Sequence, residues 1–319
     1  MIQPFGPDFM ESGELAFPQR ITLELTNRCN LRCGFCPRHF SHSPRGFMEL
    51  DLFVACIDEI AGHPGVAVVP FFRGEALLHP QFLEMMRYAR GCGIGPIQLA
   101  TNGLCLSEEI AQELLDLGLD FLSLSLDTCR PELYQELRPG GDYATVHRHL
   151  LRFLALRAGH PQARTQVQVS AVETARTRPF LPEFIDYWRS RVDQVRVYPE
   201  HSVEGRFGKL NRPPIAGERR PCLKVVTEMV IYWNGEVALC NHDWDRSEPL
   251  GNVREQGLTG VWQGTAYREV RQRHGEGRTH EDPTCRDCDH WQAYYCEELR
   301  IGRLIPPPGA EDRTKNHGR

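Results

Sequence analysis

The sequence predicts an α/β fold built around a parallel sheet. Short apolar runs typical of strands alternate with longer amphipathic runs typical of helices from residue 20 to about residue 200. The strand-like runs are Ile21–Leu25, Val66–Phe72, Ile97–Thr101, Phe121–Leu126, Val167–Val172 and Val195–Tyr198. The helical runs are Leu50–Ala61, Pro80–Arg90, Ser107–Leu117, Tyr143–Arg157 and Leu181–Arg189. Right-handed connections would wind such a series into an open or closed barrel with the helices outside. Periodicity alone does not exclude a doubly wound sheet.

Length and composition narrow the class of protein. The chain has 319 residues, enough for one large domain and a smaller appendage. Its formal net charge of −5 gives no electrostatic reason to expect a nucleic-acid partner. The chain starts without a basic segment followed by an apolar one, and it has no run of about 18 apolar residues, so we expect a cytoplasmic protein without a membrane span. In that reducing compartment, the 12 cysteines are better explained as ligands, reactive thiols or core residues than as disulfides.

Three of these cysteines, Cys29, Cys33 and Cys36, form a C-x3-C-x2-C run directly after the first strand-like run. A [4Fe–4S] cluster normally takes four cysteine ligands, so three thiolates from one loop leave one iron open to a ligand from outside the polypeptide. Structural zinc sites instead favour two C-x2-C pairs, and disulfide scaffolds are far shorter than this chain. The triplet therefore favours an iron–sulfur site with one open iron.

The spacing of the triplet, with the aromatic Phe35 before the third cysteine, resembles the radical S-adenosylmethionine (radical SAM) superfamily. The resemblance implies that the amino and carboxylate groups of S-adenosylmethionine chelate the open iron. An electron from the cluster then cleaves the sulfonium, and the resulting 5′-deoxyadenosyl radical abstracts a hydrogen atom from substrate. The same resemblance implies a partial (β/α)6 barrel and an external electron donor such as flavodoxin or ferredoxin.

A motif after the second strand-like run adds to the resemblance. Arg73-Gly74-Glu75-Ala76 is similar to the superfamily's Gly-Gly-Glu-Pro motif, which implies that Gly74 and Glu75 hold the amino group of the cofactor's methionine portion. Two positions depart from the motif, because Arg73 replaces the first Gly and Ala76 replaces Pro.

Two further positions match recurrent barrel sites of the superfamily. Asn102 follows the third strand-like run, and Ser125 lies in the fourth. The resemblance implies that both approach the ribose or the carboxylate of the cofactor. Residues at the carboxyl ends of parallel strands converge on one open face, where the active sites of parallel barrels lie.

A second cysteine set follows near the C-terminus and consists of Cys222, Cys240, Cys285 and Cys288. These cysteines lie before, at the end of and after the segment Thr227–Cys240. This segment is predicted to form a hairpin, because Asn234-Gly235 supplies the positive φ angles of a type I′ turn. The set resembles the truncated SPASM, or twitch, extension of some radical SAM enzymes, which implies one auxiliary [4Fe–4S] cluster bound by these four cysteines. Full SPASM domains carry seven or more cysteines, whereas only Cys296 remains here. Two cysteine pairs would also suit a zinc ribbon.

These observations predict a domain order. Residues 1–19 form an N-terminal extension, 20–202 the radical SAM partial barrel, 203–221 a connector, 222–305 a twitch or SPASM-like domain, and 306–319 a flexible tail. The C-terminal domain is expected to contain the hairpin and one helix at Leu258–Arg273.

The auxiliary cluster points to alcohol oxidation. The spacing of the second set is similar to that of aminoglycoside-pathway enzymes such as the aminocyclitol alcohol dehydrogenase of butirosin biosynthesis. Deprotonation of a hydroxyl-bearing carbon radical gives a strongly reducing ketyl, and passing its electron to a nearby cluster yields the ketone. The protein must add a base and a polyol pocket. Candidate polar groups are Tyr198, Glu200, His201 and Glu204 beyond the sixth strand, and His242 and Asp243 after Cys240.

Three alternatives stay open. An epimerase would return a hydrogen atom from the opposite face, and Cys105 and Cys129, which follow strand ends, are candidate thiol donors. A peptide-modifying enzyme commonly has a separate N-terminal peptide-binding domain, for which the roughly 18 residues before the first strand are too few. A non-catalytic metal-binding module would not need the intact cysteine triplet.

Overall fold

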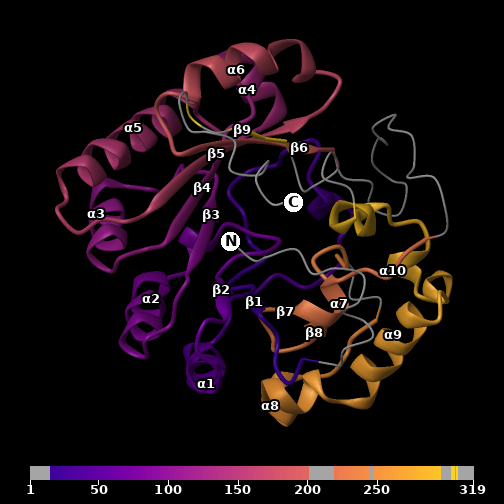
Figure 1. The fold of residues 1–319 in the computed structure, drawn as a ribbon. Coiled ribbons are helices and arrows are strands. Elements are labelled where there is room, and N and C mark those ends of the chain that lie inside the picture. Colours follow the sequence, from indigo (N-terminus) through magenta and orange to yellow (C-terminus); the bar gives the residue numbers. More distant parts are fainter. Residues whose placement is uncertain (1–14, 201–218, 245–247, 296–302, 306, 308–319) are drawn as a thin grey trace, which may run out of the picture. The chain divides into compact units, whose positions relative to one another are not determined.

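The computed structural model describes residues 15–200, 219–244, 248–295, 303–305 and 307 of the chain. It consists of two compact units, each built around its own sheet (Figure 1). The first unit comprises Met1–Asn30, Phe35–Ile97 and His201–Arg300, and the second comprises Leu31–Gly34, Gln98–Glu200 and Ile301–Arg319. Each unit contains segments that are distant in the sequence, and the predicted domain order stays a prediction.

The sheet of the first unit joins the start of the chain to its C-terminal third. Its strand order is β2-β1-β7-β8. The strands span Ala67–Val69 (β2), Arg20–Leu23 (β1), Glu228–Ile231 (β7) and Val237–Ala238 (β8). The strand β1 pairs in parallel with both β2 and β7, whereas β7 and β8 are antiparallel. Because β1 is central, its apolar side chains are fully buried, with Ile21 and Leu23 both 0% exposed.

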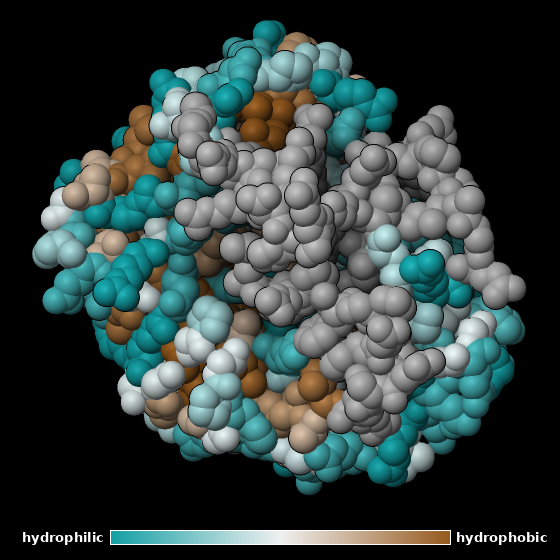
Figure 2. All heavy atoms as spheres, in the orientation of Figure 1, coloured by the Kyte–Doolittle hydropathy of each residue, from teal (hydrophilic) through white to brown (hydrophobic). Residues whose placement is uncertain are grey.

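The helices of the first unit follow the prediction up to residue 91 and depart from it in the C-terminal third, where α7 and α10 were not predicted. They span Leu50–Ala61 (α1), Phe82–Gly91 (α2), Lys224–Thr227 (α7), Val253–Trp262 (α8), Thr265–Gly275 (α9) and Pro283–Arg286 (α10). The single helix expected at Leu258–Arg273 is wrong, because Gly264 has extended backbone angles (φ −69°, ψ 164°) and separates α8 from α9. On the face shown in Figure 2, the outer side of α9 is largely hydrophilic, as expected for an amphipathic surface helix.

The hairpin between β7 and β8 is present, but its predicted type I′ turn is wrong. Gly235 has a positive φ of 90°, whereas Asn234 does not belong to the described residues with positive φ. The Gly235 N–H donates to the Tyr232 carbonyl, and the Tyr232 N–H donates to the Glu236 carbonyl. A type I turn followed by a left-handed glycine therefore closes this hairpin.

The second unit is a mainly parallel sheet with helices. Its strand order is β3-β4-β5-β6-β9. The strands span Gln98–Thr101 (β3), Phe121–Ser125 (β4), Gln166–Glu173 (β5), Gln194–Pro199 (β6) and Arg303–Ile305 (β9). The helices span Glu108–Asp116 (α3), Pro131–Leu137 (α4), Tyr143–Gly159 (α5) and Leu181–Trp188 (α6). The helix α4 and the antiparallel edge strand β9 were not predicted.

The predicted fold class is confirmed as α/β with parallel sheets, and the strands and helices at residues 20–200 alternate as expected. None of the helices in the described residues combines the length and the apolar composition needed to cross a membrane.

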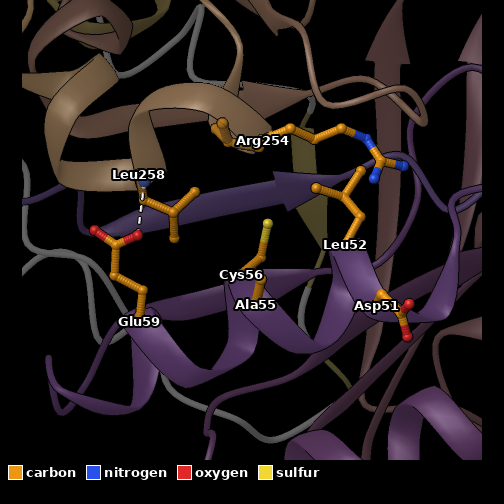
Figure 3. A pocket seen from close by; sticks show the side chains of 9 residues that line it. Asp51, Leu52, Ala55, Cys56, Glu59, Arg254 and Leu258 are labelled. Atoms are coloured by element: carbon orange, nitrogen blue, oxygen red, sulfur yellow. Dashed lines mark hydrogen bonds between the residues drawn. The ribbon is translucent and has the colours of Figure 1, made fainter.

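A carboxylate links α1 to α8 within the first unit. Glu59 accepts hydrogen bonds from the backbone N–H of Leu258 at 2.7 Å and of Thr259 at 2.7 Å, and from the Thr259 hydroxyl at 2.6 Å. It lies at the edge of a cavity of about 200 Å³ between the two helices, into which the Cys56 thiol points (Figure 3). Gly257 has a positive φ of 68°, so a new helical turn begins at Leu258 and Glu59 caps it.

We expect Glu59→Ala to lower the free energy of unfolding by about 1–2 kcal/mol, the usual cost of losing a helix cap. Burial raises the pKa of Glu59, but the hydrogen bonds from Thr259 and Leu258 outweigh it and leave the pKa lowered. The contribution of the Glu59 carboxylate to the free energy of unfolding is therefore complete above the unfolded-state pKa of about 4.3. It is lost as the pH falls through the lower folded-state pKa. Chemical denaturation between pH 3 and pH 7 measures it. The exposed Glu84 is the control, and an equal effect of Glu84→Ala would contradict the capping role.

Candidate functional site

Hydrogen bonds between two loop segments fix the backbone just before the cysteine triplet. The Thr26 hydroxyl donates to the Gly46 carbonyl at 2.6 Å, and the Asn27 amide donates to the Pro44 carbonyl at 2.6 Å. The Asn27 side-chain oxygen accepts from the Gly46 N–H at 3.0 Å. Thr26 and Asn27 are buried, so the backbone leading to Cys29 is fixed.

Gly74 lies where two backbone segments approach closely. A Cβ at this position would lie 2.2 Å from the Thr26 carbonyl oxygen and 2.5 Å from that of Arg28. The next residue, Glu75, donates its N–H to the Arg28 carbonyl at 2.8 Å, and its carboxylate is buried. Glycine is therefore needed at Gly74 so that the motif after β2 can pack on the loop that carries Cys29.

Arg73, which departs from the superfamily motif, forms a buried ion pair with Glu24. The pair is bidentate, with Nε to Oε1 at 2.6 Å and Nη2 to Oε2 at 2.7 Å. The third guanidinium nitrogen donates to the Trp244 carbonyl at 2.8 Å, and the Cζ atom lies 4.1 Å from the centre of the Tyr232 ring. Burial lowers the pKa of Arg73, but Glu24 outweighs it and raises the pKa overall.

In the second unit, Cys33 lies near a buried cation. The Arg138 Nη1 atom lies 3.7 Å from the Cys33 sulfur, within the distance of a hydrogen bond to sulfur. The predicted cofactor contacts Asn102 and Ser125 lie where β3 and β4 end, and Asn102 is buried. The Asn102 side chain accepts from the Leu104 N–H at 3.0 Å, which closes the turn after β3.

One face of the second sheet is polar. Ser123 pairs in register with Gln168, and Ser125 with Ser170, which in turn pairs with Arg196. The Gln168 amide donates to the Ser123 hydroxyl at 2.9 Å, so these side chains share a face. The alternate residue Leu124 lies on the other face, where a Cβ on Gly103 would meet both Leu124 and Val146 of α5 at 3.1 Å. The polar face is therefore the one away from α5.

The four C-terminal cysteines come together in the first unit. Cys222, Cys240, Cys285 and Cys288 line one small cavity, together with His242, His274 and His290. Burial raises the pKa of each thiol, to about 12 for Cys222, and the charges of the other cysteines raise it further for Cys222, Cys240 and Cys285. A bound cation stabilises thiolates and so offsets the raised pKa values, and the four thiols in one cavity fit a four-thiolate metal site.

Polar neighbours complete this thiol cavity. His274 accepts the Cys222 N–H through Nδ1 at 3.1 Å, and its Nε2 lies 3.5 Å from the Cys285 sulfur. Burial lowers the pKa of His274 to about 4 despite the neighbouring Asp282. Because Nδ1 is an acceptor, the neutral ring carries its proton on Nε2 and donates it to the Cys285 sulfur. The Cys240 sulfur accepts from the His242 N–H at 3.3 Å.

The candidate catalytic residues lie in different surroundings. Glu200 follows β6 and is half-buried, and burial raises the pKa of its carboxyl group. His242 lies in the thiol cavity with its ring centre 4.3 Å from that of His290. Cys105 is half-buried in the loop after β3. His201 and Glu204 lie outside the described residues, as does Cys296.

Cys129 lies against the helices of the second unit. Burial and the Glu183 carboxylate raise the pKa of its thiol to about 11, and its side-chain partners are Trp188 of α6 and Tyr143 of α5. Its role as a hydrogen donor stays a prediction.

Comparison with protein families identifies the chain. Residues 23–157 match the model of the radical SAM superfamily, and residues 222–289 match that of SPASM, an iron–sulfur cluster-binding domain. Together these matches cover more than half of the chain. The chain contains a radical SAM domain and a SPASM domain. Its cofactors are accordingly S-adenosylmethionine with a [4Fe–4S] cluster, and auxiliary iron–sulfur in the SPASM domain. The SPASM match favours iron–sulfur over the zinc ribbon that four thiols alone would also permit.

Two named proteins illustrate how far sequence similarity to this chain extends. The tungsten-containing aldehyde ferredoxin oxidoreductase cofactor-modifying protein of Pyrococcus furiosus is 27% identical, and the match covers 83% of this chain and 86% of that protein. The GTP 3′,8-cyclase of Limosilactobacillus fermentum is 36% identical, but over only 40% of this chain and 39% of the cyclase.

Solved structures share the fold at low sequence identity. BtrN in complex with AdoMet and 2-DOIA has a TM-score of 0.58 and 18% identity, and the match covers 87% of this chain and 94% of BtrN. Streptococcus suis SuiB bound to its precursor peptide SuiA has a TM-score of 0.68 and 17% identity, with 81% and 67% covered.

Sequence reasoning missed the residues that act through distant partners. Glu24, Arg138 and His274 lie outside every motif, and their partners are 49, 105 and 52 residues away in the chain. No local pattern could have found them. The predicted cluster ligands and cofactor contacts stay predictions, although the four C-terminal thiols do share one cavity.

We expect Gly74→Ala to reduce iron incorporation and thermal stability, because the new methyl group would displace the loop that carries Cys29. Gly91→Ala is the matched control, since a Cβ there meets nothing within 4 Å. Iron per chain after anaerobic reconstitution and the thermal unfolding midpoint measure both variants. Wild-type iron content and stability in Gly74→Ala would show that the close approach is not required.

Proposed function

We propose that this radical SAM enzyme oxidises a secondary alcohol of a sugar or aminocyclitol to a ketone. In the balanced reaction, the carbinol carbon gives one hydrogen atom to the 5′-deoxyadenosyl group, the hydroxyl gives one proton to a base, and one electron passes to the auxiliary cluster. S-adenosylmethionine and its cluster supply the radical chemistry when bound, and a low-potential donor such as flavodoxin or ferredoxin supplies their electron.

The single observation that carries the proposal is the set of four cysteine thiols that line one cavity. Because Cys222, Cys240, Cys285 and Cys288 all line one cavity, a cluster there would have four protein ligands and no open position for substrate. Such a cluster suits electron transfer. A dehydrogenase needs an electron acceptor for its substrate radical, whereas an epimerase needs a hydrogen-atom donor.

The polar face of the second sheet supports a polar substrate. Its serine, glutamine and arginine side chains offer the hydrogen-bonding groups that a polyol needs. Glu200 follows β6, next to the polar face on this strand, and we assign it as the base. Its burial raises the pKa of the carboxyl, which makes the carboxylate a better acceptor for a proton near neutral pH.

The relatives support this proposal to different degrees. BtrN, whose structure contains AdoMet and 2-DOIA, supports a small-molecule substrate. SuiB bound to its precursor peptide and the cofactor-modifying protein of Pyrococcus furiosus make a peptide or a cofactor precursor the competing substrate classes. The substrate test must therefore include all three classes.

The deciding experiment is an anaerobic incubation in heavy water with S-adenosylmethionine, a reductant and a panel of sugar and aminocyclitol alcohols. We expect one 5′-deoxyadenosine per ketone formed and no solvent deuterium in the product. A product of inverted configuration that carries one deuterium would make the enzyme an epimerase. Turnover only with peptides or cofactor precursors in a parallel panel would overturn the substrate class.

Cys288→Ala tests the electron acceptor. We expect it to lose about half of the iron of the reconstituted protein and to stop ketone formation, while cleavage of S-adenosylmethionine continues. Cys92→Ala is the matched control, because Cys92 is also half-buried but lies at the end of α2. Iron content, 5′-deoxyadenosine and ketone are measured for both. Undiminished ketone formation in Cys288→Ala would remove the auxiliary cluster from the reaction.

A further inference from the structure

Arg138 is a buried arginine whose guanidinium spans two different groups. It follows α4 and is 5% exposed. Its Nε atom donates to Asp127 Oδ2 at 2.6 Å, and its Nη1 atom lies 3.7 Å from the Cys33 sulfur. Here one nitrogen is directed at a cysteine of the C-x3-C-x2-C run.

The backbone on both sides of Cys33 holds it against Arg138. The Arg32 N–H donates to the Pro139 carbonyl at 3.0 Å, and the Gly34 N–H donates to the Leu137 carbonyl at 3.1 Å. The two neighbours of Cys33 are thus bonded to the two neighbours of Arg138. This pairing places the sulfur and the guanidinium opposite each other, so their contact is set by the backbone and not by a flexible side chain alone.

Asp127 is fixed in turn by the strand beside it. Its Oδ1 atom accepts from the Val172 N–H at 2.8 Å, and its own N–H donates to the Ser170 carbonyl at 3.1 Å. Its φ of 66° is the single positive value among the described non-glycine residues, a conformation that costs of order 1 kcal/mol or more. The fold keeps this strained backbone where the carboxylate meets Arg138, which indicates that the orientation of the guanidinium matters.

We propose that Arg138 is a positioning residue that holds Cys33 and raises the reduction potential of the radical SAM cluster. The proposal rests on the proposed ligand role of Cys33. A reduced cluster carries one more negative charge than an oxidised one, so a neighbouring cation that donates a hydrogen bond to a ligand sulfur stabilises the reduced form. Asp127 keeps the guanidinium oriented, and the ease of reduction then depends on a residue that touches neither substrate nor S-adenosylmethionine.

The test is a redox titration of the anaerobically reconstituted holoenzyme, followed by electron paramagnetic resonance. The signal that changes when S-adenosylmethionine is added reports the radical SAM cluster. We expect Arg138→Gln to make reduction at least tenfold less favourable, which is a shift of about 59 mV to more negative potential. Arg130→Gln is the matched control, because Arg130 precedes α4, pairs with Glu183 and is exposed. Its potential should equal that of the wild type.

Each outcome decides the proposal. An unchanged potential in Arg138→Gln with wild-type iron content would overturn it. If Arg138→Gln does not fold, Arg138→Lys decides. Lysine keeps the positive charge but lacks the planar guanidinium that can bond Asp127 and Cys33 at the same time. A partial shift to more negative potential in Arg138→Lys supports the proposal, and a wild-type potential overturns it. Wild-type protein without iron after reconstitution would instead mean that the proposed function fails.

Discussion

The buried ion pair between Glu24 and Arg73 is the contact on which the first unit depends. Glu24 lies directly after β1, and Arg73 directly precedes Gly74 and Glu75. Glu24 also accepts the Trp233 N–H at 3.3 Å, and Arg73 also bonds the Trp244 carbonyl. One pair therefore joins the approach to the cysteine triplet, the glycine motif and the segment after Cys240. Either charge left alone in this interior would be strongly destabilising, of order 3–5 kcal/mol, so the three segments are fixed together.

This contact explains the departure of the sequence from the superfamily motif. A glycine at position 73 could not reach Glu24 or the Trp244 carbonyl. Arginine can reach both, because its planar guanidinium bonds a carboxylate through two nitrogens and keeps a third nitrogen free to donate to a carbonyl. Tyr232 adds a ring face 4.1 Å from the guanidinium carbon, and its hydroxyl donates to the Asp243 carbonyl. The radical SAM motif and the SPASM domain are thereby linked through a residue that the motif alone marks as an exception.

Features that depend on a local sequence pattern could be predicted. Contacts between residues that lie far apart in the sequence could not. The bounds of α1 are the predicted ones, because its apolar residues recur with helical spacing. The type of the turn at Asn234-Gly235 and the break at Gly264 were missed, since each has more than one local solution and tertiary packing selects among them. Glu59, Glu24 and Arg138 carry ordinary charges in the sequence, and only the fold brings each to its partner. Both cysteine sets could be proposed as cluster ligands from the sequence alone, because ligand spacing is itself a local signal.

The parallel pairing of β1 with β7 has a consequence for biosynthesis. Arg20 pairs with Glu228 and Leu23 with Ile231, so the first strand meets one of its two neighbours about 200 residues later. A ribosome adding about 5–20 residues per second needs roughly 10–40 s to deliver that partner. During this time, one edge of an apolar strand has no native partner, and such edges are where nascent chains aggregate. Production of this enzyme should therefore depend on chaperones and on growth temperature more than its ordinary composition suggests.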